Sequence, residues 1–370
     1  MEAVEGSSQN EFNAKISALR RLLDHHGVDA VLLRRASSFA WATCGGASYV
    51  NTAASEGAAS LLVTREQLFL AASVIEAPRL EQEEKLVDQG WTFQIAPWHT
   101  PTAALEKLTA GRTLISDVPY QGAAVAAAEI ARLRAHLTPE EAGRFRVLGR
   151  LCAESMTAAV QQVRPGMSEY ELAALLSGEA QKRGVLPVVN LVATDERAFL
   201  YRHPLPTGKK LQKYAMLVLS GRRWGLVCSI TRLLHFGPPP ADLQRRIEAA
   251  ARVNAALVAS TRPGVTLGEV LNTGIQAYAA GGYPDEWRRH HQGGIAGYEP
   301  RELLATPGSP ERLSANQALA WNPSIAGAKM EDTILTDEQG FENLTPTPLW
   351  PVLPVEVNGQ TVPCSLALEL

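Results

Sequence analysis

The sequence lacks the features that would mark a secreted or membrane-spanning protein. Its 370 residues contain four cysteines with no CxxC pair among them, at Cys44, Cys152, Cys228 and Cys364. This spacing favours free thiols in a reducing compartment over a disulfide scaffold. The first residues lack the basic and apolar segments of a signal peptide, and no apolar run reaches the ~18 residues that a membrane span needs. We therefore expect a cytoplasmic protein.

An excess of charge of one sign is also missing. Lysine and arginine number 35, aspartate and glutamate 38, and the net charge is −3. This balance gives no electrostatic reason to expect nucleic acid or membrane as a partner. No GxGxxG sequence follows a strand to cradle a nucleotide, and the 8 histidines form no HxH, HxxxH or HExxH motif. We expect no cofactor, and a small molecule or short peptide as the ligand.

The length and the order of apolar runs predict two domains, because single cores stop growing near ~250 residues. Short apolar runs such as VDAVLLRR (28–35) and LFLAAS (68–73) alternate with helical stretches, which predicts an α/β domain with a mixed sheet over residues 1–137. At Thr138 the sequence TPEE supplies a capping hydroxyl, a proline for the first helical position and a glutamate three residues after the cap. A second domain is therefore expected over residues 138–370.

A weak internal repeat occurs in the second domain. RPGMSEYE (164–171) and RPGVTLGE (262–269) start 262 − 164 = 98 residues apart, and each predicts a turn followed by a capped helix. Such a turn and cap could also arise twice by chance. Because a helix and then strands follow both copies, we favour two similar α-α-β-β halves with a cleft between them.

The candidate ligand residues of the predicted cleft are too few and too poorly placed for a metal centre. His290 and His291 are neighbours, so in an extended stretch they should point to opposite faces and not share one ion. The same alternation should separate Glu331 from Asp332. The other strands expected to line the cleft are apolar or neutral, so we expect no metal there.

Five segments resemble, in order and spacing, the pita-bread proteins, the family that includes creatinase, prolidase, Xaa-Pro aminopeptidase and methionine aminopeptidase. They are ERAFLYRHPLPT (196–207), SITRLLHFG (229–237), HHQGGIAGYEPRE (290–302), WNPS (321–324) and KMEDTILTDEQGFENLTP (329–346). The resemblance implies a creatinase-like or prolidase-like N-terminal α/β domain over 1–137, a pseudo-symmetric pita-bread domain over 138–370, and a homodimer.

The metallopeptidases of this family hold two metal ions with two aspartates, one histidine and two glutamates. Carried over in turn, these ligands fall on 218–220, Ser229, Gly294, Asn322 and Glu331. Only Glu331 matches, and losing the other ligands should remove most of the ~10 kcal/mol that a tight divalent site supplies. The resemblance is therefore to a divergent member that lacks most metal ligands.

The resemblance also suggests catalytic roles. His203 matches a histidine that contacts substrate in the metallopeptidases and transfers protons in metal-free creatinase, and His290 matches a second histidine that contacts substrate or stabilises the transition state. Glu331 would then bind a cationic group or orient a base. Each residue also has a purely structural alternative. His203 could be a solvated loop histidine, and His290 could form a hydrogen-bonded surface pair with His291. Glu331 could be a half-buried carboxylate paired with Lys329 or Arg232.

The remaining candidates would bind substrate. Arg301 stands where the peptidases have a histidine, which favours an anionic group on the ligand, although a salt bridge to Glu299 or Glu302 is an equal alternative. Ser229 and Asn322 replace former metal ligands in the cleft, and Ser229 is not expected to be a nucleophile because its strand has no nucleophile elbow. Aromatic residues near the N-terminus match a region that reaches over the neighbouring subunit's cleft; they are Phe39, Trp41 and Tyr49, with a core position as the alternative for Trp41.

Three functions remain open at this point. The first is a metal-independent hydrolase of a small C–N-bonded compound, with His203, His290 and Glu331 as catalytic residues. The second is a non-catalytic protein that binds a peptide or metabolite in the cleft. The third is an Xaa-Pro dipeptidase or aminopeptidase with atypical ligands, which the missing donors disfavour because such hydrolysis depends on metal-bound hydroxide.

Overall fold

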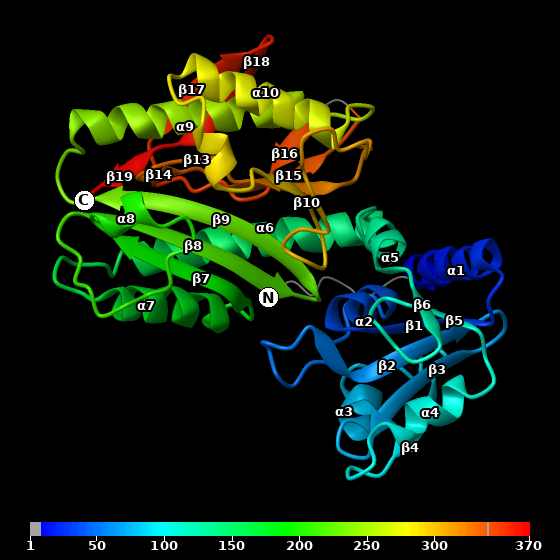
Figure 1. Cartoon of the computed structure of the whole chain (residues 1–370). Helices are drawn as coiled ribbons and strands as arrows, with labels where there is room; N and C mark the ends of the chain where they lie inside the picture. Colours follow the sequence, from blue (N-terminus) through cyan, green and yellow to red (C-terminus); the bar gives the residue numbers. More distant parts are fainter. Residues whose placement is uncertain (1–8, 339) are drawn as a thin grey trace. The chain divides into compact units, whose positions relative to one another are not determined.

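The computed structural model describes residues 9–338 and 340–370, which form two compact units (Figure 1). The first unit runs to Arg134 and includes Trp224–Leu226, and the second takes Ala135–Arg223 and Val227–Leu370. Within the described residues, none of the helices has both the length and the apolar character that crossing a membrane requires.

The first unit is built on a mixed sheet with the strand order β4-β3-β2-β1-β5-β6. Strand β1 runs antiparallel to β2 and parallel to β5, as the alternating pattern predicts. The amphipathic N-terminal helix buries Phe12, Ile16, Leu19 and Leu23 at helical spacing. In chain order the elements are α1 (Gln9–His26), β1 (Ala30–Arg35), α2 (Ala36–Ala42), β2 (Glu56–Thr64), β3 (Leu68–Ser73), α3 (Ala77–Gln82), β4 (Thr92–Ala96), α4 (Ala103–Thr109), β5 (Leu114–Ser116), β6 (Ala123–Val125) and α5 (Ala127–Arg134).

The second unit begins with two helices and an antiparallel hairpin, and a similar order then recurs. Its first part contains α6 (Pro139–Val160), α7 (Glu169–Lys182), β7 (Leu186–Thr194), α8 (Arg197–Leu200), β8 (Tyr214–Arg223) and β9 (Leu226–His235). Its second part contains α9 (Ala241–Ser260), α10 (Leu267–Ala280), the 3-10 turn η1 (Glu286–Arg289), β10 (Gly293–Ala296), β11 (Leu303–Leu304), β12 (Ala318–Trp321), β13 (Ser324–Ile325), β14 (Ala328–Lys329), β15 (Asp332–Thr336) and β16 (Phe341–Asn343). The chain ends with β17 (Val352–Val357), β18 (Gln360–Ser365) and β19 (Ala367–Glu369).

Two sheets form the centre of the second unit. One has the order β19-β9-β8-β7 and the other β11-β10-β12-β15-β16. Helices α6 and α7 pack on the first sheet through β8 and β7, whereas α9 packs over β12, β13 and β14 and is itself covered by α10 (Figure 1). The sheets are linked where Thr231 of β9 forms an isolated bridge with Glu331. The helices thus enclose the strands from opposite sides, and the strands meet at Glu331.

The internal repeat is confirmed in the backbone. Gly166 and Gly264 of the two Arg-Pro-Gly turns both adopt a φ of 88°. Their amides donate to Leu211 and Leu313 respectively, each bond being 2.8 Å long. A positive φ of this kind is accessible to glycine at little steric cost, which explains why both turns carry it.

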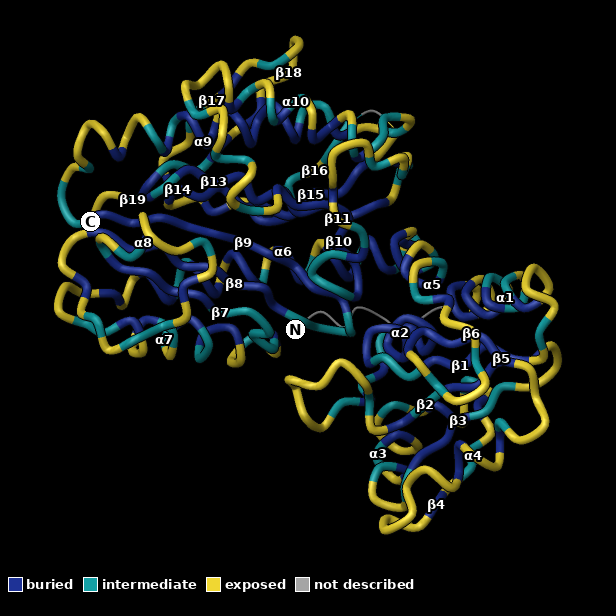
Figure 2. The backbone as a smooth tube through the Cα atoms, viewed as in Figure 1, coloured by how far each residue is buried: buried dark blue, intermediate teal, exposed yellow. Residues whose placement is uncertain are grey.

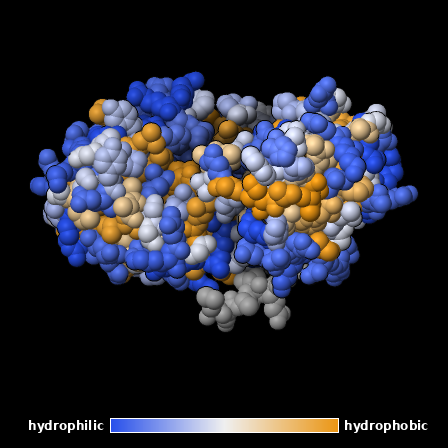
Figure 3. Space-filling model, turned by 90° about the horizontal axis from the view of Figure 1, so that it is seen from below, coloured by the Kyte–Doolittle hydropathy of each residue, from blue (hydrophilic) through white to orange (hydrophobic). Residues whose placement is uncertain are grey.

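Burial follows the amphipathic patterns of the sequence. The tube in Figure 2 is buried along the central strands, and its exposed stretches lie on helix surfaces and loops. Apolar residues also reach the surface among hydrophilic ones on the face drawn in Figure 3. In the whole described structure, irrespective of that view, the strongly exposed apolar side chains include Leu200 at 67% and Leu205 at 71%, which flank His203 in the sequence.

Three capping boxes open the long helices α6, α7 and α10, as the sequence predicts. In each, the capping hydroxyl accepts a bond from the amide of a glutamate three residues later, and that glutamate binds the cap's own amide. The caps are Thr138, Ser168 and Thr266.

Removing one capping hydroxyl should destabilise the second unit measurably. We expect Ser168→Ala and Thr266→Ala each to lower the free energy of unfolding by about 1 kcal/mol, because an amide at the helix start loses its acceptor. Urea denaturation followed by circular dichroism measures the change. The matched variants Ser168→Thr and Thr266→Ser keep a hydroxyl and should stay close to the parent; equal losses in all four variants would contradict the capping argument.

Candidate active site

A cavity of about 290 Å³ lies where the strands of the second unit meet. Strands β7, β8 and β9 supply one part of its wall, and the loop after α8, the segments on either side of β10 and the β12–β15 region supply the rest. The lining residues are Val189, Leu191, His203, Val218, Ser220, Ser229, His291, Pro300, Arg301, Asn322, Lys329 and Glu331. The segments that suggested a cleft between two halves are therefore brought together, although they are up to 142 residues apart in the chain (331 − 189 = 142).

Glu331 is the centre of a buried ion cluster in this cavity. Its carboxylate accepts a bond from the Arg301 guanidinium at 3.0 Å and from the Thr231 hydroxyl at 2.6 Å. The Lys329 ammonium lies 3.4 Å from the same carboxylate, and both side chains are 4% exposed. The predicted alternative of a pairing with Lys329 is thus observed, and Arg301 joins it.

Opposing effects set the protonation of this cluster. Burial on its own would raise the pKa of Glu331, but Lys329, Arg301 and the Thr231 hydroxyl together lower it to about 2. Burial lowers the pKa of Lys329, and the neighbouring Glu331 acts in the opposite direction. Glu331 is therefore ionised at neutral pH, and it holds two cations in place rather than serving as a proton acceptor.

The salt-bridge partner of Arg301 differs from the one predicted, whereas its expected contact with an anionic ligand remains a prediction. The sequence suggested Glu299 or Glu302 as its salt-bridge partner, but the structure pairs it with Glu331. The reason is that Glu302 turns back to accept bonds from the amides of Tyr298 and Glu299 within its own loop. The guanidinium consequently faces the cavity, with its side chain 10% exposed.

Asp332 points away from the cavity, as alternation along an extended segment predicts. It accepts a bond of 2.7 Å from Arg232, which is itself 2% exposed. Although KMEDTILT reads as one continuous strand, the structure interrupts it between β14 and β15, and Glu331 stands in the interruption. This break lets Glu331 meet Thr231 across the two sheets.

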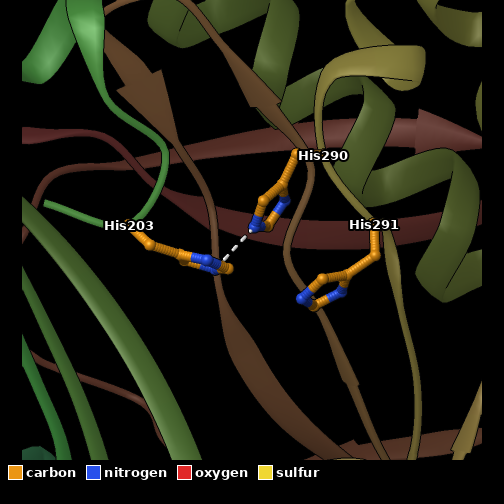
Figure 4. A group of neighbouring side chains, drawn as sticks. All are labelled: His203, His290 and His291. Atoms are coloured by element: carbon orange, nitrogen blue, oxygen red, sulfur yellow. Dashed lines mark hydrogen bonds between the residues drawn. The ribbon is translucent and has the colours of Figure 1, made fainter.

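Three histidines form a cluster (Figure 4), of which His203 and His291 line the cavity whereas His290 is not among its lining residues. His203 lies on the loop after α8, and its Nε2 is 2.9 Å from Nε2 of His290, so one ring donates and the other accepts. The rings of His290 and His291 stack at a centroid distance of 4.4 Å with 26° between their planes. The three residues each bring a ring nitrogen within 4.8 Å of the others.

The prediction that His290 and His291 point to opposite faces was wrong. Alternation applies to a strand held in a ladder, whereas these residues lie between η1 and β10, before the ladder begins. Their backbone is free to place both rings on one side, as Figure 4 shows. Neighbouring histidines outside a strand can therefore share one site.

The imidazoles are held in their neutral form. Burial, followed by the charge of Lys329, lowers the pKa of His290 to about 2. Burial and then Arg301 lower the pKa of His291 to about 4. The pKa of His203 is also lowered, by partial burial and by Lys329, although its ring is the more exposed of the hydrogen-bonded pair. At neutral pH all three rings are therefore uncharged.

Neutral side chains occupy the remaining floor of the cavity. Ser229 is 1% exposed, and its hydroxyl lies 2.9 Å from that of Ser220 on the adjacent strand. Asn322 is 2% exposed, and its Oδ1 finds no hydrogen-bond partner among the described residues. Both predicted substrate-binding residues thus line the cavity.

The residues present do not fit the two metal ions that the resembled metallopeptidases hold. Of the five ligand positions, Val218, Ser229 and Asn322 line the cavity with neutral groups, and Glu331 is already bound by Lys329 and Arg301. At Gly294, φ is 151° and a Cβ would run into the Leu303 carbonyl, so the backbone excludes a histidine there. The three clustered imidazoles are a donor set that transition metals prefer, but the cations that oppose their protonation also oppose a divalent ion.

The aromatic residues proposed as a lid lie mainly in the core of the first unit. Phe39 is 0% exposed and Trp41 is 2% exposed, both on helix α2. Fully enclosed side chains offer no surface to a substrate, so the lid expectation is corrected for Phe39 and the core alternative is observed for Trp41. Tyr49 is half-buried in the loop that follows α2 and keeps part of its ring exposed.

Lys329 is the important site residue that the sequence did not assign to the site. From the sequence, Lys329 is expected only as a salt-bridge partner of Glu331, because a single lysine in a strand is usually solvated. A signal was nevertheless present, since Lys329 precedes Glu331 by two residues, which places both side chains on one face of an extended segment.

Comparisons with known proteins agree with this architecture. Residues 143–338, just over half of the chain, match the model of metallopeptidase family M24. An uncharacterized peptidase of Staphylococcus epidermidis is 26% identical over 194 residues, covering 50% of this chain and 54% of the relative. The agropine synthesis cyclase of Rhizobium rhizogenes is 27% identical over 219 residues, covering 52% of this chain and 54% of the cyclase.

The same fold occurs among solved structures. The prolidase of Pyrococcus horikoshii OT3 superposes with a TM-score of 0.78 at 19% identity, covering 90% of this chain and 99% of the prolidase. At this identity the likeness shows the fold alone, and the chain spans about half the length of the curated relatives cited above. The family match, the pita-bread fold and the missing ligands together show that this chain is a divergent member of metallopeptidase family M24.

Proposed function

We propose that the protein is a metal-independent hydrolase of a small C–N-bonded compound. The observation that carries the proposal is the 2.9 Å contact between the Nε2 atoms of His203 and His290, beside a cavity whose carboxylate is held by Lys329 and Arg301. The imidazoles can move protons, and the buried cations can stabilise negative charge without a metal ion. The cavity volume of about 290 Å³ suits a small molecule or a short peptide.

The hydrolytic step follows from these groups. Neutral His203 accepts a proton from a water molecule, and the water oxygen forms a bond to the carbon of the scissile C–N bond. Negative charge developing on that carbon's other heteroatom is stabilised by a ring N–H of His290. The C–N bond then breaks, and the proton held by His203 passes to the leaving nitrogen, so water is consumed and the imidazole is restored.

The relatives support a chemistry other than peptide hydrolysis within this fold. One curated relative is named as a cyclase, whereas others carry the name of peptidases without further characterisation. Because ligands for two ions are lacking here, Xaa-Pro peptide cleavage through metal-bound hydroxide is the less favoured proposal. The expected cytoplasmic location, the homodimer, and the absence of nucleic-acid and membrane partners remain predictions.

The first test concerns metal content. We expect the purified protein to carry no stoichiometric manganese, zinc or cobalt, because four of the five ligand positions are neutral and the fifth is bound by basic side chains. Elemental analysis after gel filtration measures the content. Two equivalents of metal per chain, together with metal-stimulated cleavage of Xaa-Pro dipeptides, would overturn the proposal.

The second test concerns the histidine pair. Hydrolysis of small amides, ureido compounds or guanidino compounds should continue in EDTA and should fall by about 10² or more in His203→Ala, because general acid–base catalysis contributes this much. His136→Ala, which alters an exposed histidine elsewhere in the unit, serves as the matched control. Ligand-dependent thermal stabilisation without turnover in the parent protein would instead indicate a binding protein.

The third test concerns pH. Because the folded structure lowers the pKa of His203 below 6.5, the basic form persists to lower pH than in a free imidazole. We therefore expect kcat/KM to stay level as pH falls from 8 to the ordinary histidine pKa of about 6.5 and to decline only at lower pH. An acid limb centred at or above pH 6.5 would contradict the assignment of His203 as the base.

A further inference from the structure

The charges around the cavity do not cancel. Among the described residues that line it, the basic side chains Arg301 and Lys329 stand against a single carboxylate, that of Glu331. Other charged groups nearby are matched with one another, since Arg202 pairs with Glu286 and Arg232 pairs with Asp332. With the imidazoles neutral, the lining carries one unmatched positive charge.

Hydrogen-bonding capacity is also unused at this place. The buried Nε of Arg301 and Oδ1 of Asn322 find no partner among the described residues. A buried polar atom that forms no hydrogen bond destabilises the protein, so a ligand that supplies the missing hydrogen bond is favoured at such a place. The first can donate to an anionic oxygen, and the second can accept from an N–H group.

The rest of the wall limits what can enter. Val189, Leu191 and Val218 present apolar surface from adjacent strands of one sheet. A volume of about 290 Å³ is at the small end of ligand sites. The occupant must therefore combine a compact apolar body with a polar end.

We propose that the cavity selects substrates that carry a carboxylate and an adjacent N–H group, with Lys329 as the residue that determines this specificity. The carboxylate binds beside Lys329 and Arg301 in the region where the metallopeptidases of the family hold their ions, Asn322 accepts the N–H, and the apolar body contacts Val189, Leu191 and Val218. An N-acyl amino acid or a ureido acid has this chemistry. The inference rests on the proposed function in taking the ligand to be a substrate.

Binding of a charged probe and its neutral isostere tests the charge selection. The probes are N-acetylvaline and N-acetylvalinamide, which share one shape and differ by one negative charge. Isothermal titration calorimetry in a buffer free of carboxylates should show the acid binding at least about tenfold more tightly, because charge-assisted hydrogen bonds are the stronger kind. Equal affinities, or tighter binding of the amide, would overturn the inference.

Variants identify the residue responsible. Lys329→Met keeps the length of the side chain and leaves Glu331 its bonds to Arg301 and Thr231, and it should reduce the preference for the acid to within about twofold. Lys213→Met, which alters an exposed lysine just before β8, should retain the full preference. Thermal unfolding checks that each variant folds; if Lys329→Met does not, Lys329→Gln is measured instead, and an undiminished preference in the folded variant rejects the assignment.

The outcome separates this inference from the proposed function. A strong preference for the acid without any C–N cleavage would leave the carboxylate site standing and remove the hydrolase. Cleavage of neutral amides at rates equal to those of their acid counterparts would keep the hydrolase and reject the carboxylate site.

Discussion

The buried ion cluster of Glu331, Lys329 and Arg301 is the constraint on which the site depends. A carboxylate that is 4% exposed needs partners, since an unpaired charge in such surroundings costs several kcal/mol. The Lys329 ammonium at 3.4 Å and the Arg301 guanidinium at 3.0 Å supply those partners. The positive charge beside Glu331 is thus carried by two side chains, so the sequence itself determines how much charge there is and where it lies.

This ion cluster determines what the histidines can do. The cations that satisfy Glu331 lie close enough to oppose protonation of His203, His290 and His291, and burial acts in the same direction. The rings therefore remain neutral at physiological pH. One electrostatic arrangement thus repels further cations, favours an anionic ligand and maintains a proton acceptor beside it.

The fold could be predicted from the sequence further than the site. Local signals were sufficient for the capping boxes at Thr138, Ser168 and Thr266 and for the mixed sheet, because each depends on residues close in the chain or on regular alternation. The His290–His291 stack was missed, since the end of a ladder is not visible in the pattern. The pairing of Arg301 with Glu331 spans 30 residues and depends on the loop that turns Glu302 inward, which only the folded chain reveals.

The backbone at Gly294 is an obstacle to a metal-binding histidine at that position. At Gly294 a φ of 151° and the nearby Leu303 carbonyl exclude any side chain, so a histidine ligand would require β10 and β11 to move apart. An acidic residue introduced at Ser229 or Asn322 would share the cavity with Lys329 and Arg301, which would compete with a metal ion for its negative charge. The cationic cluster and the close strand pairing thus disfavour the two-metal site of the resembled peptidases independently, because replacing one side chain would leave the other obstacle in place.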